Sequence, residues 1–393
     1  MTKGPAAVFL GTIDERKIKY MLTEPCEETL KITLLMGDFH KHAGAKMITF
    51  GDWEVPAYYT TIIEEHRCVR EKAGIFDVSH MGEIVISGSD ARAFLQYVLT
   101  NDIDNYDYGT AFYSLLCNER GGIVDDVFVY PVTEGQYFLI VNASNIEKDH
   151  AWLCAHNAFS DAHIENVSER RAMIACQGPR SNEIVSRVFE CDAQVIGFHK
   201  FIEMPYGGDK AVISASGYTG ERGFEIMFDN DLGHTIWNAL LKAGEQYGLQ
   251  PIGFGARDTL RIEAGCPLYG HELTDDISPF EVRCGWVVKL EKARDFIGKD
   301  SLVKAKDRGV QRKLFGLEMI ERSVPRENYE VFKNDERVGQ ITSGSYLPSV
   351  DKNAAMALLN ATQVTSGDTV EVLIRSRRYK ALVTNLPFYK AQR

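Results

Sequence analysis

At 393 residues the chain is too long for a single ordinary core, and we expect two or three domains. The balance of 45% hydrophobic and 25% charged residues is typical of a folded globular protein and disfavours extensive disorder. A net charge of −11 disfavours nonspecific binding to nucleic acids or anionic membranes, because both depend on clustered lysine and arginine. A local basic site for an anionic ligand remains compatible with this charge.

The eight cysteines contain no Cys-x-x-Cys pair, so we expect reduced thiols and no metal site. No apolar run reaches the ~20 residues that span a bilayer, and the N-terminus lacks the apolar core of a signal peptide. Residues 1–35 balance acidic and basic side chains, which matches an import sequence poorly. We interpret them as an N-terminal extension or as sequence upstream of the true start. The expected location is cytoplasmic, or the mitochondrial matrix in a eukaryote.

Helical and strand patterns alternate irregularly up to residue 300. Helices are predicted at 58–72, 90–99, 145–157, 180–189, 231–247 and 256–265. Asp90 is the expected N-cap of the second helix, and Gly248 is expected to end the fifth. Strands are predicted at 84–88, 127–130, 137–141, 211–214 and 224–228. The second and third of these are expected to form a hairpin. This order favours an α+β fold over a doubly wound parallel sheet.

Beyond residue 300 the pattern changes to short strands separated by turn signals. These strands are predicted at 314–319, 329–332, 338–342, 369–374 and 380–383. They indicate a separate small β domain that begins near residues 305–310.

The stretch Ser216–Glu225 (Ser-Gly-Tyr-Thr-Gly-Glu-Arg-Gly-Phe-Glu) places an aromatic ring and carboxylates in a glycine-rich turn. Glycine lets the backbone approach a ligand closely, Tyr218 offers a face for stacking, and a carboxylate accepts paired N–H donors. A flat, nitrogen-rich heterocycle such as a pterin or purine would use all three. The alternative is a hairpin turn whose aromatic residues pack inward and whose acids are solvated.

Arg257 and Arg261 stand four residues apart in a predicted helix, so both guanidinium groups lie on one face. They could grip a ligand carboxylate, or pair with nearby acids as structural ion pairs. Asp102 follows a predicted helix, where aspartate is usually a cap or turn residue; its functional alternative is to orient an amine or take its proton. Trp286 is either a pocket wall or a core residue.

Three other motifs carry no predicted chemistry. Asp125 and Asp126 are neighbours on a strand and point to opposite faces, so we interpret them as solvated or capping residues. The run Gly253–Asp258 begins like a dinucleotide fingerprint but has aspartate in place of the third glycine. His271-Glu272 lacks the second histidine of a zinc protease motif.

A set of short motifs, taken together, resembles the aminomethyltransferase family, the T-protein of the glycine cleavage system. The motifs run in family order along the chain, at 51–56, 76–83, 100–102, 118–126, 141–143, 177–179, 217–225, 255–265, 269–273, 341–344 and 387–389. The resemblance implies an α+β, three-domain, folate-binding T-protein-like fold. Residues 1–35 would form an extension, 36–304 a folate-binding catalytic region of two intertwined subdomains, and 305–393 a small C-terminal β barrel.

The resemblance also implies an enzyme of one-carbon metabolism. It would transfer an aminomethyl group from the lipoyl arm of H-protein to tetrahydrofolate, releasing ammonia and giving 5,10-methylenetetrahydrofolate and the reduced arm. The implied partners are lipoylated H-protein and folate. Asp102 matches the family's catalytic aspartate, Tyr218 and Glu225 match pterin contacts, and Arg257 matches the arginine of the folate pocket. Weaker matches, by motif neighbourhood, are Asn142, Tyr113 and Trp286.

The sequence departs from the family pattern beside these motifs. Ala215 stands where an arginine is usual, and Val55 replaces a common methionine. Such changes gather around substrate access, so they motivate an alternative: a tetrahydrofolate-dependent demethylase or methyltransferase for a free small sulfonium or amine substrate. A third alternative is a non-catalytic folate-binding protein of the same superfamily.

Overall fold

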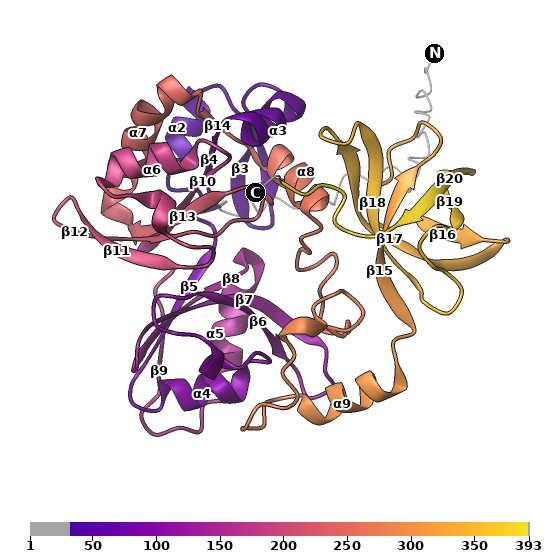
Figure 1. Cartoon of the computed structure of the whole chain (residues 1–393), viewed down its shortest axis with the longest axis horizontal. Helices are drawn as coiled ribbons and strands as arrows, with labels where there is room; N and C mark the ends of the chain where they lie inside the picture. Colours follow the sequence, from indigo (N-terminus) through magenta and orange to yellow (C-terminus); the bar gives the residue numbers. More distant parts are fainter. Residues whose placement is uncertain (1–31, 392–393) are drawn as a thin grey trace, which may run out of the picture.

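The computed structural model describes residues 32–391, which form two mixed subdomains and a barrel grouped around the centre of the molecule (Figure 1). The first subdomain is built on a six-stranded sheet of order β11-β12-β13-β10-β4-β14, and the second on a five-stranded sheet of order β6-β7-β8-β5-β9. The closed barrel has the order β15-β18-β17-β16-β19-β20, and a small sheet, β1-β3-β2, completes the set. The predicted α+β architecture and the C-terminal barrel are confirmed.

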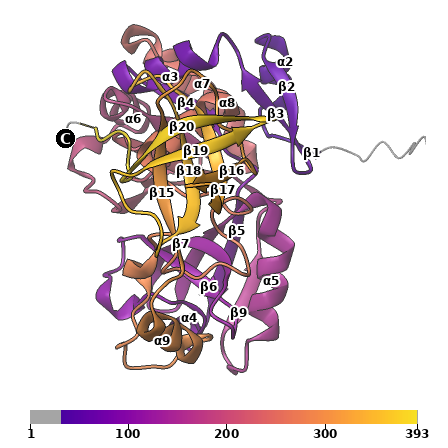
Figure 2. The ribbon, with the colours of Figure 1, turned by 90° about the vertical axis from the view of Figure 1, so that its right-hand side faces the viewer.

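The chain builds part of the first subdomain, leaves it, and then returns. The opening elements are β1 (Ile32–Thr33), α2 (Gly37–His42), β2 (Lys46–Phe50), β3 (Trp53–Tyr58), α3 (Ile62–Glu71) and β4 (Gly74–Asp77). The second subdomain follows, with β5 (Gly82–Ser87), α4 (Ala91–Val98), β6 (Phe112–Cys117), β7 (Ile123–Thr133), β8 (Gln136–Val141), α5 (Ile146–Ala155) and β9 (His163–Asn166). Figure 2 shows α5 along the outer side of this sheet.

The return to the first subdomain runs through β10 (Arg171–Gln177), α6 (Ser181–Phe189), β11 (Phe201–Tyr206), β12 (Asp209–Ser214), β13 (Gly223–Asp229), α7 (Gly233–Gly244), β14 (Gln250–Pro251) and α8 (Phe254–Ala264). Strand β10 pairs antiparallel with β4, with Ile174 opposite Asp77. The second subdomain is therefore inserted between two neighbouring strands of the first. This topology brings residues from distant parts of the sequence to the junction of the two sheets.

The N-terminal extension expected at 1–35 lies outside the described residues except for its last four. Those four belong to the folded body: β1 pairs in parallel with β3, and Leu34 is buried against Val55 and Phe254. Leucine and β-branched residues at 32–35 supply both strand propensity and apolar surface. This short strand was not predicted, because residues 1–35 were interpreted together, as a segment that balances acidic and basic side chains.

The local predictions fit most helices and hairpins of the two subdomains. Strands β7 and β8 form the predicted hairpin, and Gly248 ends the fifth helix region with φ of 70°. Asp90 stands at the N-cap position of α4, but its carboxylate accepts hydrogen bonds from Asp161 N and Ser160 Oγ rather than from the helix. The predicted capping role is wrong, because a neighbouring loop competes for the same oxygen.

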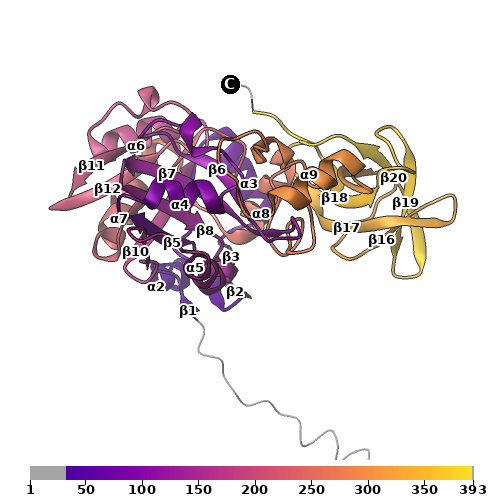
Figure 3. The same ribbon diagram turned by 90° about the horizontal axis from the view of Figure 1, so that it is seen from below.

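The barrel lies at one end of the molecule, beyond α9 (Lys299–Arg308) (Figure 3). Its strands are β15 (Arg312–Met319), β16 (Glu330–Lys333), β17 (Glu336–Leu347), β18 (Lys352–Asn360), β19 (Thr369–Ile374) and β20 (Arg377–Thr384). The sequence prediction omitted β18, whose Ala, Met and Leu residues favour helices in isolation. Pairing with β15 and β17 on both sides overrides that preference. The expected division between 304 and 305 falls inside α9 and stays a prediction.

A buried ion-pair network joins the barrel to the rest of the chain. Arg70 on α3 contacts Glu263 of α8 at 2.8 Å and Glu221 at 2.9 Å, and its guanidinium lies 4.1 Å from the centre of the Tyr389 ring. The second oxygen of Glu263 accepts a 2.8 Å hydrogen bond from the backbone N–H of Ser349, which follows β17. Burial alone would raise the pKa of Glu263, but a hydrogen bond from His66 and the charge of Arg70 hold it below its ordinary value.

We expect Arg70→Ala to lower the free energy of unfolding by about 3–5 kcal/mol, because the substitution removes the cation from the fully buried Glu263. Chemical denaturation measures this change. The matched control is Arg120→Ala, which removes an ion pair whose side chains are 75% and 86% exposed and should change stability by less than about 0.5 kcal/mol. Equal losses of stability in the two variants would contradict the claim that the buried ion pairs of Arg70 stabilise the fold.

Candidate active site

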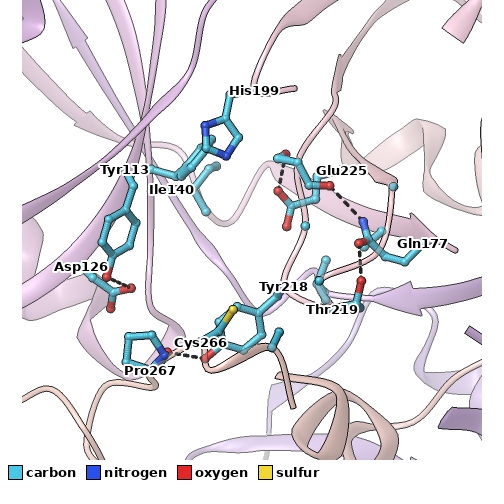
Figure 4. Close-up of a pocket in the computed structure, with 18 of the residues that line it drawn as sticks. Tyr113, Asp126, Ile140, Gln177, His199, Tyr218, Thr219, Glu225, Cys266 and Pro267 are labelled. Atoms are coloured by element: carbon cyan, nitrogen blue, oxygen red, sulfur yellow. Dashed lines mark hydrogen bonds between the residues drawn. The ribbon is translucent and has the colours of Figure 1, made fainter. Parts of the chain in front are cut away.

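A cavity of about 590 Å³ lies where the two subdomain sheets meet the segment that follows α8. This volume is within the range of pockets that hold small molecules. Its lining is mostly apolar and aromatic, with a few polar groups that converge from different elements: Tyr113 and Asp126 of the second subdomain, Gln177, Tyr218 and Glu225 of the first, and Arg257 of α8. Figure 4 shows these walls facing each other across the cavity.

The glycine-rich stretch forms one wall of this cavity. It is the loop between antiparallel strands β12 and β13, as the hairpin alternative predicts, and its residues border the cavity. A Cβ atom at Gly217 would lie 2.0 Å from Gln177 Oε1, and one at Gly223 would lie 2.4 Å from Gln177 Cδ. A side chain at either position would displace the Gln177 amide, which is hydrogen-bonded to the loop, so glycine lets the loop close tightly over that side chain.

Gln177, at the end of β10, fixes the shape of that loop. Its amide nitrogen donates to Ser216 O at 3.0 Å and Phe224 O at 3.3 Å, and its oxygen accepts a 3.0 Å hydrogen bond from Thr219 Oγ1. The sequence reasoning did not assign a role to Gln177. The only available signal was its place in a family motif, because no local pattern shows that a glutamine on one strand fills a loop 40 residues away.

Glu225 faces the cavity from β13. Its Oε2 accepts a 2.6 Å hydrogen bond from Ser216 Oγ, the one side-chain donor that it has within residues 32–391. Burial raises the pKa of Glu225, although the Ser216 hydrogen bond and the charge of Arg257 act in the opposite direction. One carboxylate oxygen is thus left for a donor that enters the cavity.

Arg257 and Arg261 take different roles on α8. Arg261 is almost fully buried and pairs with Glu272 at 3.0 Å and Asp258 at 2.8 Å, as the ion-pair alternative describes. Arg257 has no ion pair in the described part of the chain; its guanidinium lies 4.7 Å from the centre of the Tyr218 ring. Burial lowers the pKa of Arg257. The Tyr218 hydroxyl donates to Pro267 O, which holds the ring at the cavity wall.

Asp126, on β7, faces the cavity from the opposite wall. Its Oδ2 accepts a 3.1 Å hydrogen bond from the Tyr113 hydroxyl, and its Oδ1 accepts a 2.7 Å hydrogen bond from Asn142 Nδ2. Burial, together with the charge of Asp125, raises the pKa of Asp126 to about 7. A carboxyl group with this pKa changes its charge near neutral pH, which suits proton transfer.

The interpretation of Asp125 and Asp126 as solvated or capping residues is wrong. The two side chains do point to opposite faces of β7, as expected, but both faces are covered. Asp125 is fully buried on the far side, and Asp126 borders the cavity. A pair of acids inside an apolar strand is the sequence signal that could have identified them.

Asp102 lies outside the cavity lining. It caps the short 3-10 turn Ile103–Asn105, where its Oδ1 accepts hydrogen bonds from Gln96 Nε2 at 2.6 Å and from the backbone N–H of Asp104 at 3.1 Å. This is the cap role that aspartate usually has after a helix. The structure therefore brings six of the expected site residues together (Tyr113, Asn142, Tyr218, Glu225, Arg257 and Trp286) and leaves Asp102 apart.

Comparison with known proteins shows the family. Residues 36–292 match the GCVT N-terminal domain, and residues 312–390 match the glycine cleavage T-protein C-terminal barrel domain. The chain belongs to the glycine cleavage T-protein family. An aminomethyltransferase of Geobacillus sp. is 47% identical over 92% of this chain and 99% of that protein. An aminomethyltransferase of Bacillus subtilis is 46% identical over 90% of this chain and 98% of that protein.

A solved structure supports the same family. The glycine cleavage system aminomethyltransferase T of Bartonella henselae superimposes with a TM-score of 0.86 at 31% identity, covering 92% of this chain and 99% of that one. This T-protein family member is accordingly an aminomethyltransferase of glycine cleavage. The relatives do not favour the alternative of a demethylase for free sulfonium or amine compounds. Within residues 32–391 no helix has the length and hydropathy of a membrane span.

The raised pKa of Asp126 has a consequence for stability. The unfolded chain releases this proton near pH 4, whereas the folded protein keeps it to about pH 7, so ionisation of Asp126 disfavours the folded state as the pH rises between these values. Asparagine has no proton to lose. We expect Asp126→Asn to gain on the order of 1–3 kcal/mol relative to the parent between pH 4 and pH 8, measured by denaturant unfolding at both pH values.

The control is Asp276→Asn, at a side chain that is 86% exposed, for which the difference from the parent should stay constant with pH. A constant difference for Asp126→Asn as well would show that the cavity does not raise the pKa of this carboxyl group.

Proposed function

We propose that the cavity binds tetrahydrofolate and that the enzyme transfers to it the aminomethyl group carried on the lipoyl arm of H-protein. The products are ammonia, 5,10-methylenetetrahydrofolate and the reduced dihydrolipoyl arm. The observation that carries this proposal is the pair of carboxyl groups, Glu225 and Asp126, that face one apolar cavity from opposite walls. One suits the hydrogen-bonding edge of a pterin, and the other has a pKa suited to proton transfer.

The residues present fit the chemistry of a pterin ring. The amino edge of a pterin carries neighbouring N–H donors, and Glu225 keeps an oxygen available on the side of its carboxylate that Ser216 does not use. Tyr218 supplies an aromatic wall, and the loop around Gln177 is shaped so that backbone lies close to the cavity. We propose Tyr218, Glu225 and Arg257 as the residues that hold this end of the folate.

Asp126 replaces Asp102 as the proposed catalytic carboxylate. When bound, tetrahydrofolate supplies the nitrogen nucleophile for the one-carbon group. The Asp126 carboxylate would orient that nitrogen and accept its proton, since a pKa of about 7 lets this group gain and lose a proton near neutral pH. Tyr113 and Asn142 fix one oxygen each, so both residues position Asp126 for this role.

The mouth of the cavity offers a contact surface for the carrier. Trp286 and Phe198 line the cavity yet are 58% and 59% exposed. The Trp286 ring stacks on that of Tyr113, with ring centres 6.0 Å apart, and the Tyr113 hydroxyl donates to Asp126, so Trp286 is linked to Asp126 through one residue. Exposed aromatic side chains at the mouth of a pocket are typical of interaction sites. We propose that the lipoyl arm of H-protein enters here.

The assignment of the catalytic aspartate is tested by ammonia release from the aminomethylated H-protein with tetrahydrofolate present. We expect Asp126→Asn to lower kcat by about 10²–10⁴-fold, because it removes the proton acceptor while keeping the shape of the side chain. Asp102→Asn should leave kcat within about threefold of the parent, because Asp102 caps a surface turn.

The parent should also lose activity when H-protein is replaced by a free small methylamine or methylsulfonium compound. The opposite pattern for the two aspartate variants would return the catalytic role to Asp102, and activity without H-protein would contradict the proposed donor.

A further inference from the structure

Behind Asp126, on the face of β7 that is turned away from the cavity, lies a second pair of carboxyl groups. Asp125 and Asp149, the latter on α5, are both fully buried. Asp125 accepts hydrogen bonds from three donors: Asn145 Nδ2 at 2.7 Å, Asn142 Nδ2 at 2.9 Å and Asn142 N at 3.1 Å. Neither oxygen of Asp149 has a donor in the described part of the chain. Asp125 thus has three hydrogen-bond donors, whereas its neighbour Asp149 has none within the described residues.

Two adjacent carboxyl groups cannot both be ionised at low cost when they are removed from water. The three donors to Asp125 stabilise a negative charge on that carboxyl group. Asp149 is then the neutral partner: burial and the charge of Asp125 raise its pKa to about 11. A proton on Asp149 gives this buried group the one hydrogen bond open to it, donated to the adjacent Asp125.

The pair is coupled to the cavity through Asn142. Its Nδ2 atom lies 2.9 Å from Asp125 Oδ1 and 2.7 Å from Asp126 Oδ1, so one amide group contacts both carboxylates. The charge of Asp125 is, after burial itself, the largest influence that raises the pKa of Asp126. A change in the charge of Asp125 therefore reaches the cavity carboxylate directly.

The other titratable groups around this cluster do not compete for the role. On the cavity side, Tyr113, Tyr218, Cys266 and Cys284 all have raised pKa values and are neutral near pH 7. On α5, Lys148 donates to Val124 O at 2.6 Å and to the Tyr269 hydroxyl at 2.7 Å, at the edge of the cluster. The pKa of Tyr269 is raised, and Asp275 beyond it is half exposed. Asp149 is the group that faces Asp125 with a proton to donate.

We propose that Asp149 is a positioning residue for aminomethyl transfer: as a buried neutral acid it donates a hydrogen bond to Asp125 and keeps that carboxyl group charged behind Asp126. This inference rests on the proposed function of Asp126 as the carboxylate that acts in the cavity. It assigns to α5, which contributes no residue to the cavity lining, a part in setting the pH at which the enzyme works. Asp149 touches neither substrate nor carrier in this role.

The test compares variants that keep or remove the donor. Asp149→Asn keeps a donor to Asp125, whereas Asp149→Ala removes it; Asp149→Leu also removes it while filling the space, and it serves if the alanine variant does not fold. In the donor-free variants Asp125 loses the hydrogen bond that stabilises its charge, so the influence that raises the pKa of Asp126 weakens and Asp126 loses its proton at lower pH. We expect the acidic limb of the pH profile for ammonia release to move down by about one pH unit in the donor-free variants and to stay in place in Asp149→Asn.

A second readout needs no substrate. The carboxyl carbon of Asp126 in ¹³C-labelled, ligand-free protein reports its titration by NMR, assigned through Asp126→Asn. The same downward shift in the donor-free variants, and its absence in Asp149→Asn, supports the inference even if tetrahydrofolate proves not to be the ligand. An unchanged Asp126 titration in the donor-free variants overturns the inference, as does an equal shift in Asp149→Asn. If the NMR shift appears but activity does not depend on Asp126, the proposed function fails and the coupling stands.

Discussion

The site depends on two carboxyl groups, those of Glu225 and Asp126, that face a mostly apolar cavity and form no ion pair within the described residues. Desolvation raises the free energy of a carboxylate, and a protein usually offsets that cost with an ion pair or several hydrogen bonds. Here Glu225 receives one hydroxyl donor, and Asp126 receives one hydroxyl and one amide donor. This support holds each side chain in place and leaves it incompletely satisfied. Both groups therefore retain a tendency to bind donors that enter the cavity, which is the physical basis of the proposed folate site.

The topology of the chain makes this arrangement achievable. Because the second subdomain is inserted between β4 and β10, its sheet is anchored at both ends to the first subdomain. Asp126 and Glu225 are almost 100 residues apart in sequence, yet they lie on strands whose relative position is fixed by that anchoring. The barrel is held to the same junction by Arg70, Glu263 and the C-terminal segment, whose Phe388 and Tyr389 N–H groups both donate to Glu263 O. The barrel thus closes one side of the junction.

Much of the fold could be predicted from the sequence, because helical periodicity, hairpin signals and turn residues are local properties. The α7 region ending at Gly248 and the β7–β8 hairpin are examples. Strand β18 could not be predicted in this way, since its residues favour a helix until two neighbouring strands pair with it. The same limit applies to β1, whose pairing with β3 depends on an element 20 residues away.

In the candidate site, too, the residues with local sequence signals were predicted and those that depend on tertiary structure were not. Tyr218, Glu225 and Arg257 were predicted because their motifs combine residue types whose chemistry is visible in the sequence, and the structure brings them to one cavity. The proposed catalytic carboxylate, Asp126, was not predicted, because that requires knowing which face of β7 lies against α5 and which borders the cavity. The sequence offers one signal for Asp126, its place in a pair of acids inside an apolar strand, but that signal does not show which of the two acids borders a cavity. The structure shows that Asp102 caps a turn and that Asp126 accepts a hydrogen bond from Tyr113 at the cavity.

The most direct test of this site is the structure of the enzyme in complex with tetrahydrofolate. The pterin should occupy the cavity between the two walls, with its amino edge hydrogen-bonded to Glu225 and a reactive nitrogen within hydrogen-bonding distance of Asp126, directly or through one water. A folate bound outside this cavity, or bound within it with Asp126 facing no folate nitrogen, would contradict the proposed site and its mechanism.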